Sequence, residues 1–163
     1  PKGLVFDLRN NGGGYLQTAV EVASQFIKEG VIVSEKYGDG RPVDKSNAIP
    51  GGLATDIPMV VLVNEGTASA SEIVAGAIQD YGRGKLVGVT TYGKGSVQIW
   101  TPLSNDQGAV RITIAKWLTP KDRTIHQVGL TPDVVVEMTK DDYAAARDPQ
   151  LDAAVKTLMD MLK

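Results

Sequence analysis

The chain has 163 residues, a length that suits one domain with its own hydrophobic core. Hydrophobic residues make up 42% and charged residues 22%, and the formal net charge is −2, so the composition does not favour nucleic acid or an anionic membrane as a partner. There is no cysteine and only one histidine, His126, which excludes disulfides, thiolate catalysis and a histidine-rich metal site.

The first third of the chain predicts alternating strands and helices. Residues 3–8 form a short apolar run typical of a buried parallel strand, and residues 10–14 form a glycine-rich turn. Apolar residues at helical spacing predict a helix over residues 16–27, and residues 31–34 read as the next strand of a βαβ-like unit. Residues 35–56 are polar and predict a long surface connection, with room for a short hairpin, beside the path of a substrate.

A second strand–helix–strand unit is predicted at residues 58–64, 69–81 and 85–89. Because strands alternate with helices along the chain, the sequence predicts an α/β domain. There is no internal repeat and no low-complexity tract.

The remaining residues predict further strands and a final helix. Strands are expected at residues 96–103, 108–118 and 134–138, and the second of them alternates in a way typical of a half-buried strand. An amphipathic helix is expected over residues 142–163, with Pro149 near a helix start. The alternating residues are Val110, Ile112 and Ile114, and the expected apolar helix face is Leu151, Ala154, Val155, Leu158, Met159 and Leu162.

Residues 64–98 carry the clearest sign of chemistry. Ser69 lies where an apolar strand leads into a helix, and the first N–H groups of a helix have no intrahelical acceptor. The helix dipole also favours negative charge there, so such a turn can hold a developing oxyanion. Serine at a helix start is more often only an N-cap; here Ser71 is the better candidate for that role, with Glu72 in the first turn.

Lys94 is the second candidate, because its neighbours Gly93 and Gly95 let this part of the chain approach another backbone closely. A serine hydroxyl needs a base, and a desolvated lysine can supply one, so Ser69 and Lys94 form a candidate dyad. Residues 88–95 nearly match a phosphate-binding loop. However, Gly95 replaces the required Ser or Thr, and a strand-like run follows where a helix is needed, so nucleotide binding is rejected.

The sequences NEGTASASE (64–72) and YGKGSVQ (92–98) resemble the carboxyl-terminal processing peptidases, also called tail-specific proteases. These are serine proteases that use a Ser/Lys dyad. Three further segments agree with the family, so the resemblance covers nearly the whole chain. They are DLRNNGGG (7–14), TPKDRTIHQVGLTPDVVV (119–136) and DPQLDAAV (148–155).

The resemblance implies a role for individual residues. Lys94 follows Ser69 by 25 residues and Gln98 follows Lys94 by 4, as in the family, which implies Ser69 as nucleophile, Lys94 as general base and Gln98 as the residue that orients the lysine. The oxyanion hole would combine the Ala70 N–H with an N–H from the glycine-rich loop. Gly12 or Gly13 is the expected second donor.

A Ser/His/Asp triad is the competing arrangement. His126 would be its base, with Asp133 or Asp80 as the third member, but the family pattern has no catalytic histidine at this position. Asp7 and Arg9, beside the glycine loop, are expected to make structural ion pairs or hydrogen bonds.

The resemblance also implies the fold shared by the Clp protease and crotonase families, in which repeated ββα units form stacked sheets. It implies an endopeptidase that cleaves proteins near their carboxyl termini, without metal or cofactor, in an extracytoplasmic compartment. The abrupt apolar start predicts that residues 1–163 are a fragment of the catalytic core. The family's PDZ domain and helical amino-terminal region would precede it, and their absence predicts weak or no proteolysis by the fragment.

Two other functions are compatible with this fold. One is a non-catalytic module that binds a ligand or peptide, and the other is a crotonase-type acyl-CoA enzyme. The presence of Ser69, Lys94 and Gln98 together argues against both. A homo-oligomer and a regulatory or adaptor protein remain open as partners, besides the protein substrate itself.

Overall fold

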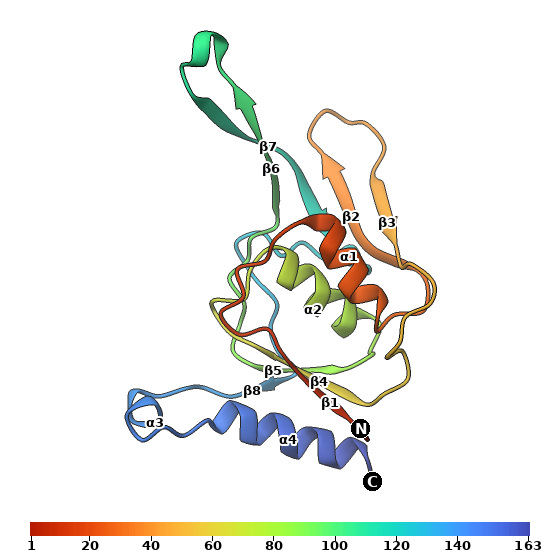
Figure 1. The fold of residues 1–163 in the computed structure, drawn as a ribbon, viewed down its shortest axis with the longest axis vertical. Helices are drawn as coiled ribbons and strands as arrows, with labels where there is room; N and C mark the ends of the chain where they lie inside the picture. The colour runs from red at the N-terminus through yellow and green to blue at the C-terminus, as the bar shows by residue number, and fades with distance from the viewer.

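The computed structural model describes residues 1–163 and contains two four-stranded sheets with helices packed around them (Figure 1). The predicted α/β class is confirmed. One sheet is parallel, with strand order β1-β4-β5-β8, and the other is antiparallel, with order β3-β2-β7-β6. The strands are β1 Leu4–Asp7, β2 Val31–Tyr37, β3 Asp44–Asn47, β4 Met59–Val63, β5 Lys85–Gly88, β6 Ser96–Pro102, β7 Ala109–Leu118 and β8 Val134–Val135. The helices are α1 Leu16–Ser24, α2 Ala70–Asp80, α3 Lys140–Ala144 and α4 Pro149–Met161, with a 3₁₀ turn, η1, at Ser104–Asp106.

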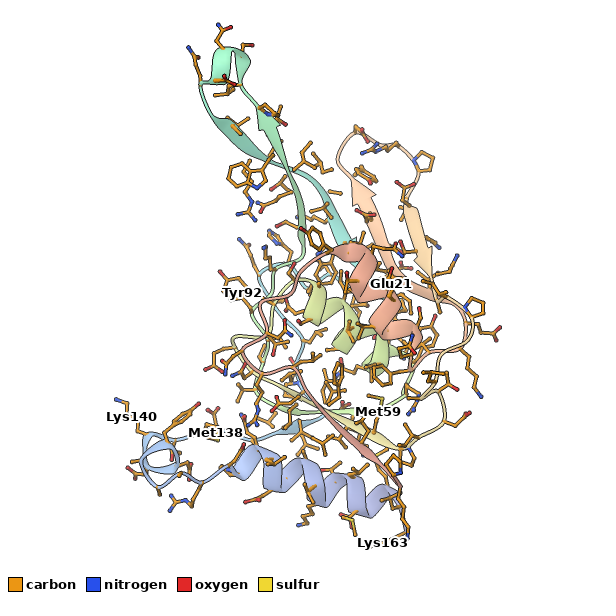
Figure 2. The ribbon with its side chains drawn as sticks, in the orientation of Figure 1. Glu21, Met59, Tyr92, Met138, Lys140 and Lys163 are labelled. Carbon is orange, nitrogen blue, oxygen red and sulfur yellow. The ribbon has the colours of Figure 1, made fainter.

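Strand β4 is the centre of the core, and every one of its residues is buried. Successive side chains of a strand point to opposite faces, so Val61 packs with α1 and α2 while Val60 and Leu62 pack on the α4 side. Figure 1 shows α4 across one side of the parallel sheet and α1 with α2 on the other. Met59, labelled in Figure 2, marks the start of this strand. The turn that follows β4 is therefore held on a rigid support.

The second predicted strand–helix–strand unit is confirmed, but the first is only partly right. Strand β4 precedes α2 and β5 follows it in the sequence, and the two strands pair in parallel. By contrast, β2 does not join β1; it pairs antiparallel with β3 and β7 in the other sheet. After the buried Ile32 and Val33, the strand continues to the exposed Lys36, as suits a sheet with one solvated face. The hairpin allowed for in residues 35–56 is present as β2–β3.

Strands β6 and β7 are confirmed, but the prediction that β7 is half-buried along its length is wrong. Val110 and Ile112 are 41% and 43% exposed. The reason is that β2 pairs only with the end of β7, from Ala115 to Leu118. The outer half of the β6–β7 hairpin therefore extends away from the body with its side chains in solvent (Figures 1 and 2).

The carboxy-terminal helix predicted over residues 142–163 is divided in two, α3 and α4. Ala146 between them has a positive φ of 51°, and α4 begins with Asp148 as N-cap and Pro149 at its first position. The expected apolar face is also only partly buried. Ala154 is fully buried and Leu158 packs against the parallel sheet, whereas Met159 is 57% exposed. No helix in the structure is long and apolar enough to cross a membrane.

Arg9 ties the end of β1 to α4, which confirms the structural role expected for Asp7 and Arg9. Its guanidinium donates to both carboxylate oxygens of Asp148 at 2.9 Å and to Asp7 Oδ2 at 2.8 Å. It also donates to Gln150 Oε1 at 3.2 Å, and Gln150 Nε2 in turn donates to the Val136 carbonyl. The glycine-rich loop after β1 is thereby anchored to the far side of the parallel sheet.

This contact predicts a specific loss of stability in acid. The Arg9 guanidinium holds the pKa of Asp148 below its usual range, so the charged carboxylate favours the folded state. That contribution is complete above the unfolded-state pKa, about 3.9, and is lost as the pH falls through the lower folded-state pKa. Urea unfolding should therefore show a smaller difference in stability between pH 6 and strong acid for Asp148→Asn than for the wild type.

Asparagine is a good N-cap, so this variant removes the charge and keeps the acceptor for the Leu151 N–H. Asp152→Asn, in the same first helical turn but without an ion pair, is the control and should follow the wild type. Equal acid sensitivity of all three proteins would show that the Arg9 contact does not stabilise the fold.

Candidate active site

Ser69 lies at the sharp turn between β4 and α2, as predicted. Its backbone has φ 57° and ψ −120°, a conformation that costs a residue other than glycine roughly 1–3 kcal/mol and is concentrated at functional sites. Ser69 occupies the N-cap position of α2, but its half-buried side chain makes no capping hydrogen bond. The prediction that Ser71 is the cap is wrong, because Ser71 lies inside α2 and donates from Oγ to Asn11 Oδ1 at 2.8 Å.

The turn before Ser69 is held onto the end of β1 by side chains that the sequence reasoning missed. Asn64 Oδ1 accepts from the Asn10 N–H at 2.8 Å and the Gly66 N–H at 3.0 Å. Thr67 Oγ1 donates to the Leu8 carbonyl at 2.7 Å. The family-like sequence NEGT could have pointed to these residues, whose side chains form hydrogen bonds with backbone groups.

The glycine-rich loop packs directly against the Ser69 turn. Gly13 has φ 94°, and a Cβ on it would lie 2.6 Å from the Ala68 carbonyl oxygen and 2.7 Å from the Ala70 nitrogen, so only glycine fits there. The Gly13 N–H already donates to Asn11 Oδ1 at 3.0 Å, whereas the Gly12 N–H makes no hydrogen bond. Of the two predicted loop donors, Gly12 therefore has the free N–H in this structure, alongside Ala70 in the first turn of α2.

The glycines around Lys94 allow the close approach that was predicted. A Cβ on Gly93 would lie 2.9 Å from the Gly129 nitrogen, and one on Gly95 would lie 2.7 Å from the His126 nitrogen. The Gly93 carbonyl also accepts from the Gln127 N–H at 2.8 Å. Residues 125–129 therefore hold the Lys94 turn in place, and the strand predicted after it is present as β6.

Glu72 is the main residue that the sequence reasoning did not assign to the site. It is fully buried and accepts four hydrogen bonds. Oε2 accepts from the N–H groups of Ser69 at 2.8 Å and Lys94 at 2.9 Å, and Oε1 accepts from the Gly93 N–H at 2.8 Å and the Thr91 hydroxyl. One carboxylate thus fixes the backbone of both members of the candidate dyad.

Gln98 lies beside Lys94 at the start of the β6–β7 hairpin. A register shift between Val97 and Gln98 marks a local irregularity of the kind that redirects a side chain. Its Nε2 donates to Thr113 Oγ1 at 3.2 Å on the facing strand, which leaves the side-chain carbonyl free to accept. This arrangement suits the predicted role of Gln98, which stays a prediction.

His126 does not form a triad. Its Nδ1 is buried and has no hydrogen-bond partner. Asp133 instead accepts from the Leu86 N–H at 2.7 Å, and Asp80 accepts from the Lys121 N–H at 2.9 Å and pairs with Arg123. Neither carboxylate is available to orient the imidazole, so the structure does not contain the competing Ser/His/Asp arrangement.

Ser69, Lys94 and Gln98 line one cavity of about 230 Å³, together with Ala70. Its remaining lining residues are Gly14, Leu16, Ile73, Ser96, Val97, Arg111 and Trp117. Lys94 and Gln98 also border a larger open groove of about 620 Å³ with Gly12 and His126. No group of three or more side chains that could hold a metal ion occurs in the structure.

The model of Peptidase family S41 matches residues 1–136. The chain belongs to peptidase family S41. It is 46% identical over 136 residues to a carboxy-terminal-processing protease of Bartonella bacilliformis, which covers 83% of the chain and 31% of that protein. It is 43% identical over 160 residues to a carboxyl-terminal-processing protease of Synechocystis, covering 98% of the chain and 36% of that protein.

Solved structures agree with this family assignment. The S41 chain superposes on a photosystem II D1 C-terminal processing protease with a TM-score of 0.78 and 41% identity, over 83% of this chain and 35% of that one. The tricorn protease, at 23% identity and a TM-score of 0.64 over 99% of this chain and 15% of that one, shares the fold. These neighbours have the Clp-protease-like fold that was predicted. The chain spans about a third of the length of the curated relatives described above.

Proposed function

We propose that residues 1–163 are the catalytic core of a serine endopeptidase that cleaves proteins near their carboxyl termini. The observation that carries the proposal is the strained Ser69 turn, which shares a cavity with Lys94 and Gln98 and is joined to the Lys94 backbone through Glu72. The names of the relatives support the same reaction. The activity, substrates, partners and extracytoplasmic location of the whole protein are parts of this proposal.

In the proposed reaction, neutral Lys94 accepts the proton of the Ser69 hydroxyl as Oγ attacks the scissile carbonyl carbon. The carbonyl oxygen becomes an oxyanion, which the N–H groups of Ala70 and the glycine-rich loop stabilise. Collapse of this intermediate breaks the C–N bond, and Lys94 gives its proton to the leaving amine. Water then attacks the acyl-enzyme carbonyl while Lys94 takes a proton from it; the ester bond to Ser69 breaks, Lys94 returns the proton to Ser69 Oγ, and the new carboxyl terminus is released.

A fluorophosphonate probe tests the proposal, because it reacts with an activated serine even when turnover is slow. Mass spectrometry of the digested protein should place the label on Ser69. Ser69→Ala should lose the label, and Ser71→Ala, a change at the neighbouring serine inside α2, should keep it. A folded wild-type protein that takes up no label, or takes it up on another serine, would refute the proposed nucleophile.

A further inference from the structure

Arg111 differs from every other arginine of the chain in having no partner for its charge. Arg9, Arg41, Arg123 and Arg147 each form an ion pair with a carboxylate, and Arg83 donates to three backbone carbonyls. The guanidinium of Arg111 makes neither kind of contact. It lies 5.8 Å from the centre of the Trp100 ring, which supports it through a cation–π contact.

This unpaired cation borders the candidate active site. Arg111 lines the 230 Å³ cavity that holds Ser69 and also the 620 Å³ groove beside it. Neither the cavity nor the groove is lined by any Asp or Glu. Tyr92, labelled in Figure 2, lies on the wall of the groove. The cleft is therefore basic although the chain has a net charge of −2, so it is complementary to a negatively charged ligand.

The hairpin sets the spacing between Arg111 and Gln98. Trp100 pairs with Arg111 across β6 and β7, and Gln98 pairs with Thr113, so the two pairs are successive neighbours on one face of the hairpin. Two residues along a strand span roughly 7 Å. An extended peptide has the same rise per residue, so a group bound by Arg111 would lie about two residues from the part of the peptide beside Gln98.

We propose that Arg111 binds a carboxylate of the substrate about two residues from the scissile bond. A guanidinium fork matches a carboxylate in shape and charge, and the unused donors of Arg111 are available for such a bidentate contact. The carboxylate is either the side chain of an acidic residue or the free carboxyl terminus of the peptide. The inference rests on the proposed function, because it assigns a specificity to the same site.

Peptide binding to the Ser69→Ala protein tests this without turnover. The probes are fluorescein-labelled alanine- and valine-rich peptides that end in a carboxylate or an amide and carry either Glu or Gln near that end. Arg111→Gln should weaken binding of the carboxylate-bearing peptides about five- to tenfold and leave the amidated Gln peptide unchanged. Added salt should reduce the difference.

Arg41→Gln is the matched control, since Arg41 also stacks on an aromatic ring, the half-buried ring of Tyr37, but away from the cleft. It should change no affinity. A dependence only on the free terminus would assign the terminal carboxylate, and a dependence on Glu in the amidated peptide would assign the side chain. Equal loss for all peptides, no loss for any, or no binding of any carboxylate peptide would overturn the inference.

Cleavage of the same peptides by protein with Ser69 intact separates this inference from the proposed function. If the peptides are cleaved but Arg111→Gln leaves the ratio of kcat/KM for charged and neutral peptides unchanged, the role of Arg111 is refuted and the protease stands. If the fluorophosphonate probe labels no serine while binding depends on Arg111 and on the carboxylate, Arg111 stands as an anion site and the proposed nucleophile is refuted.

Discussion

Lys94→Ala is expected to lower the kcat/KM for cleavage of an unfolded protein roughly 10²–10⁴-fold, the usual contribution of a general base. The fold should survive, because the half-buried side chain of Lys94 makes no hydrogen bond or ion pair, and its contact with Glu72 comes from the backbone N–H. Cleavage rates from mass spectrometry, with circular dichroism to confirm folding, provide the measurement.

Two variants show whether Lys94 acts as a base or only as a charge. Lys94→Arg keeps a positive charge but cannot give up its proton near neutral pH, so it should be as inactive as Lys94→Ala. His126→Ala should retain most of the activity, because its Nδ1 has no partner to orient the ring. Lys85→Ala, at an exposed position on β5, is the neutral control. Activity retained by Lys94→Arg but lost by His126→Ala would reverse the assignment.

Glu72→Gln is expected to produce the second-largest loss, in both catalysis and stability. Each oxygen of Glu72 accepts two hydrogen bonds. In glutamine one of these oxygens is replaced by an NH₂ group, which cannot accept, so two donors of the site lose their acceptor. A buried donor left unpaired costs about 1–3 kcal/mol. Displacement of Ser69 and Lys94 by even about 1 Å costs on the order of 10²-fold in rate. Single-turnover kinetics and urea unfolding measure the two effects.

The kinetic loss should appear in kcat with little change in KM, because Glu72 holds the reacting groups and lies below the substrate cleft. Glu21→Gln, at an exposed position on α1, is the matched control and should change neither quantity. A Glu72→Gln protein that unfolds at a lower urea concentration with an unchanged kcat would limit Glu72 to a structural role.

The sequence indicated the candidate catalytic residues more clearly than the residues that position them. The strand-to-helix turn made Ser69 a candidate and the flanking glycines made Lys94 one, and the family resemblance implied their roles. The turn and the flanking glycines are local patterns, and the structure brings both residues to one cavity. Three of the four hydrogen bonds of Glu72 come from Thr91, Gly93 and Lys94, which are distant in the sequence, so its first-turn position indicated only a favourable charge.

The two errors in the strands have a common origin in pairing over long distances. The sequence of β2 resembles a strand of either sheet, and only its pairing with β7 places it in the antiparallel one. Similarly, the alternation in β7 predicted burial that would need a second layer over the outer hairpin, and no such layer is present. Pro149 indicated the start of a new helix, but the apolar spacing continues across the break, so one helix was predicted where there are two.

Under the proposed function, the positive φ of Ser69 sets catalytic activity against thermal stability at this position. Glycine would adopt the same backbone angles without the steric cost that serine bears. A lineage released from the need to cleave peptides could therefore become more heat-resistant by the single change Ser69→Gly. The proposed role of Ser69 in turnover would account for a serine at a position where glycine is expected to be more stable.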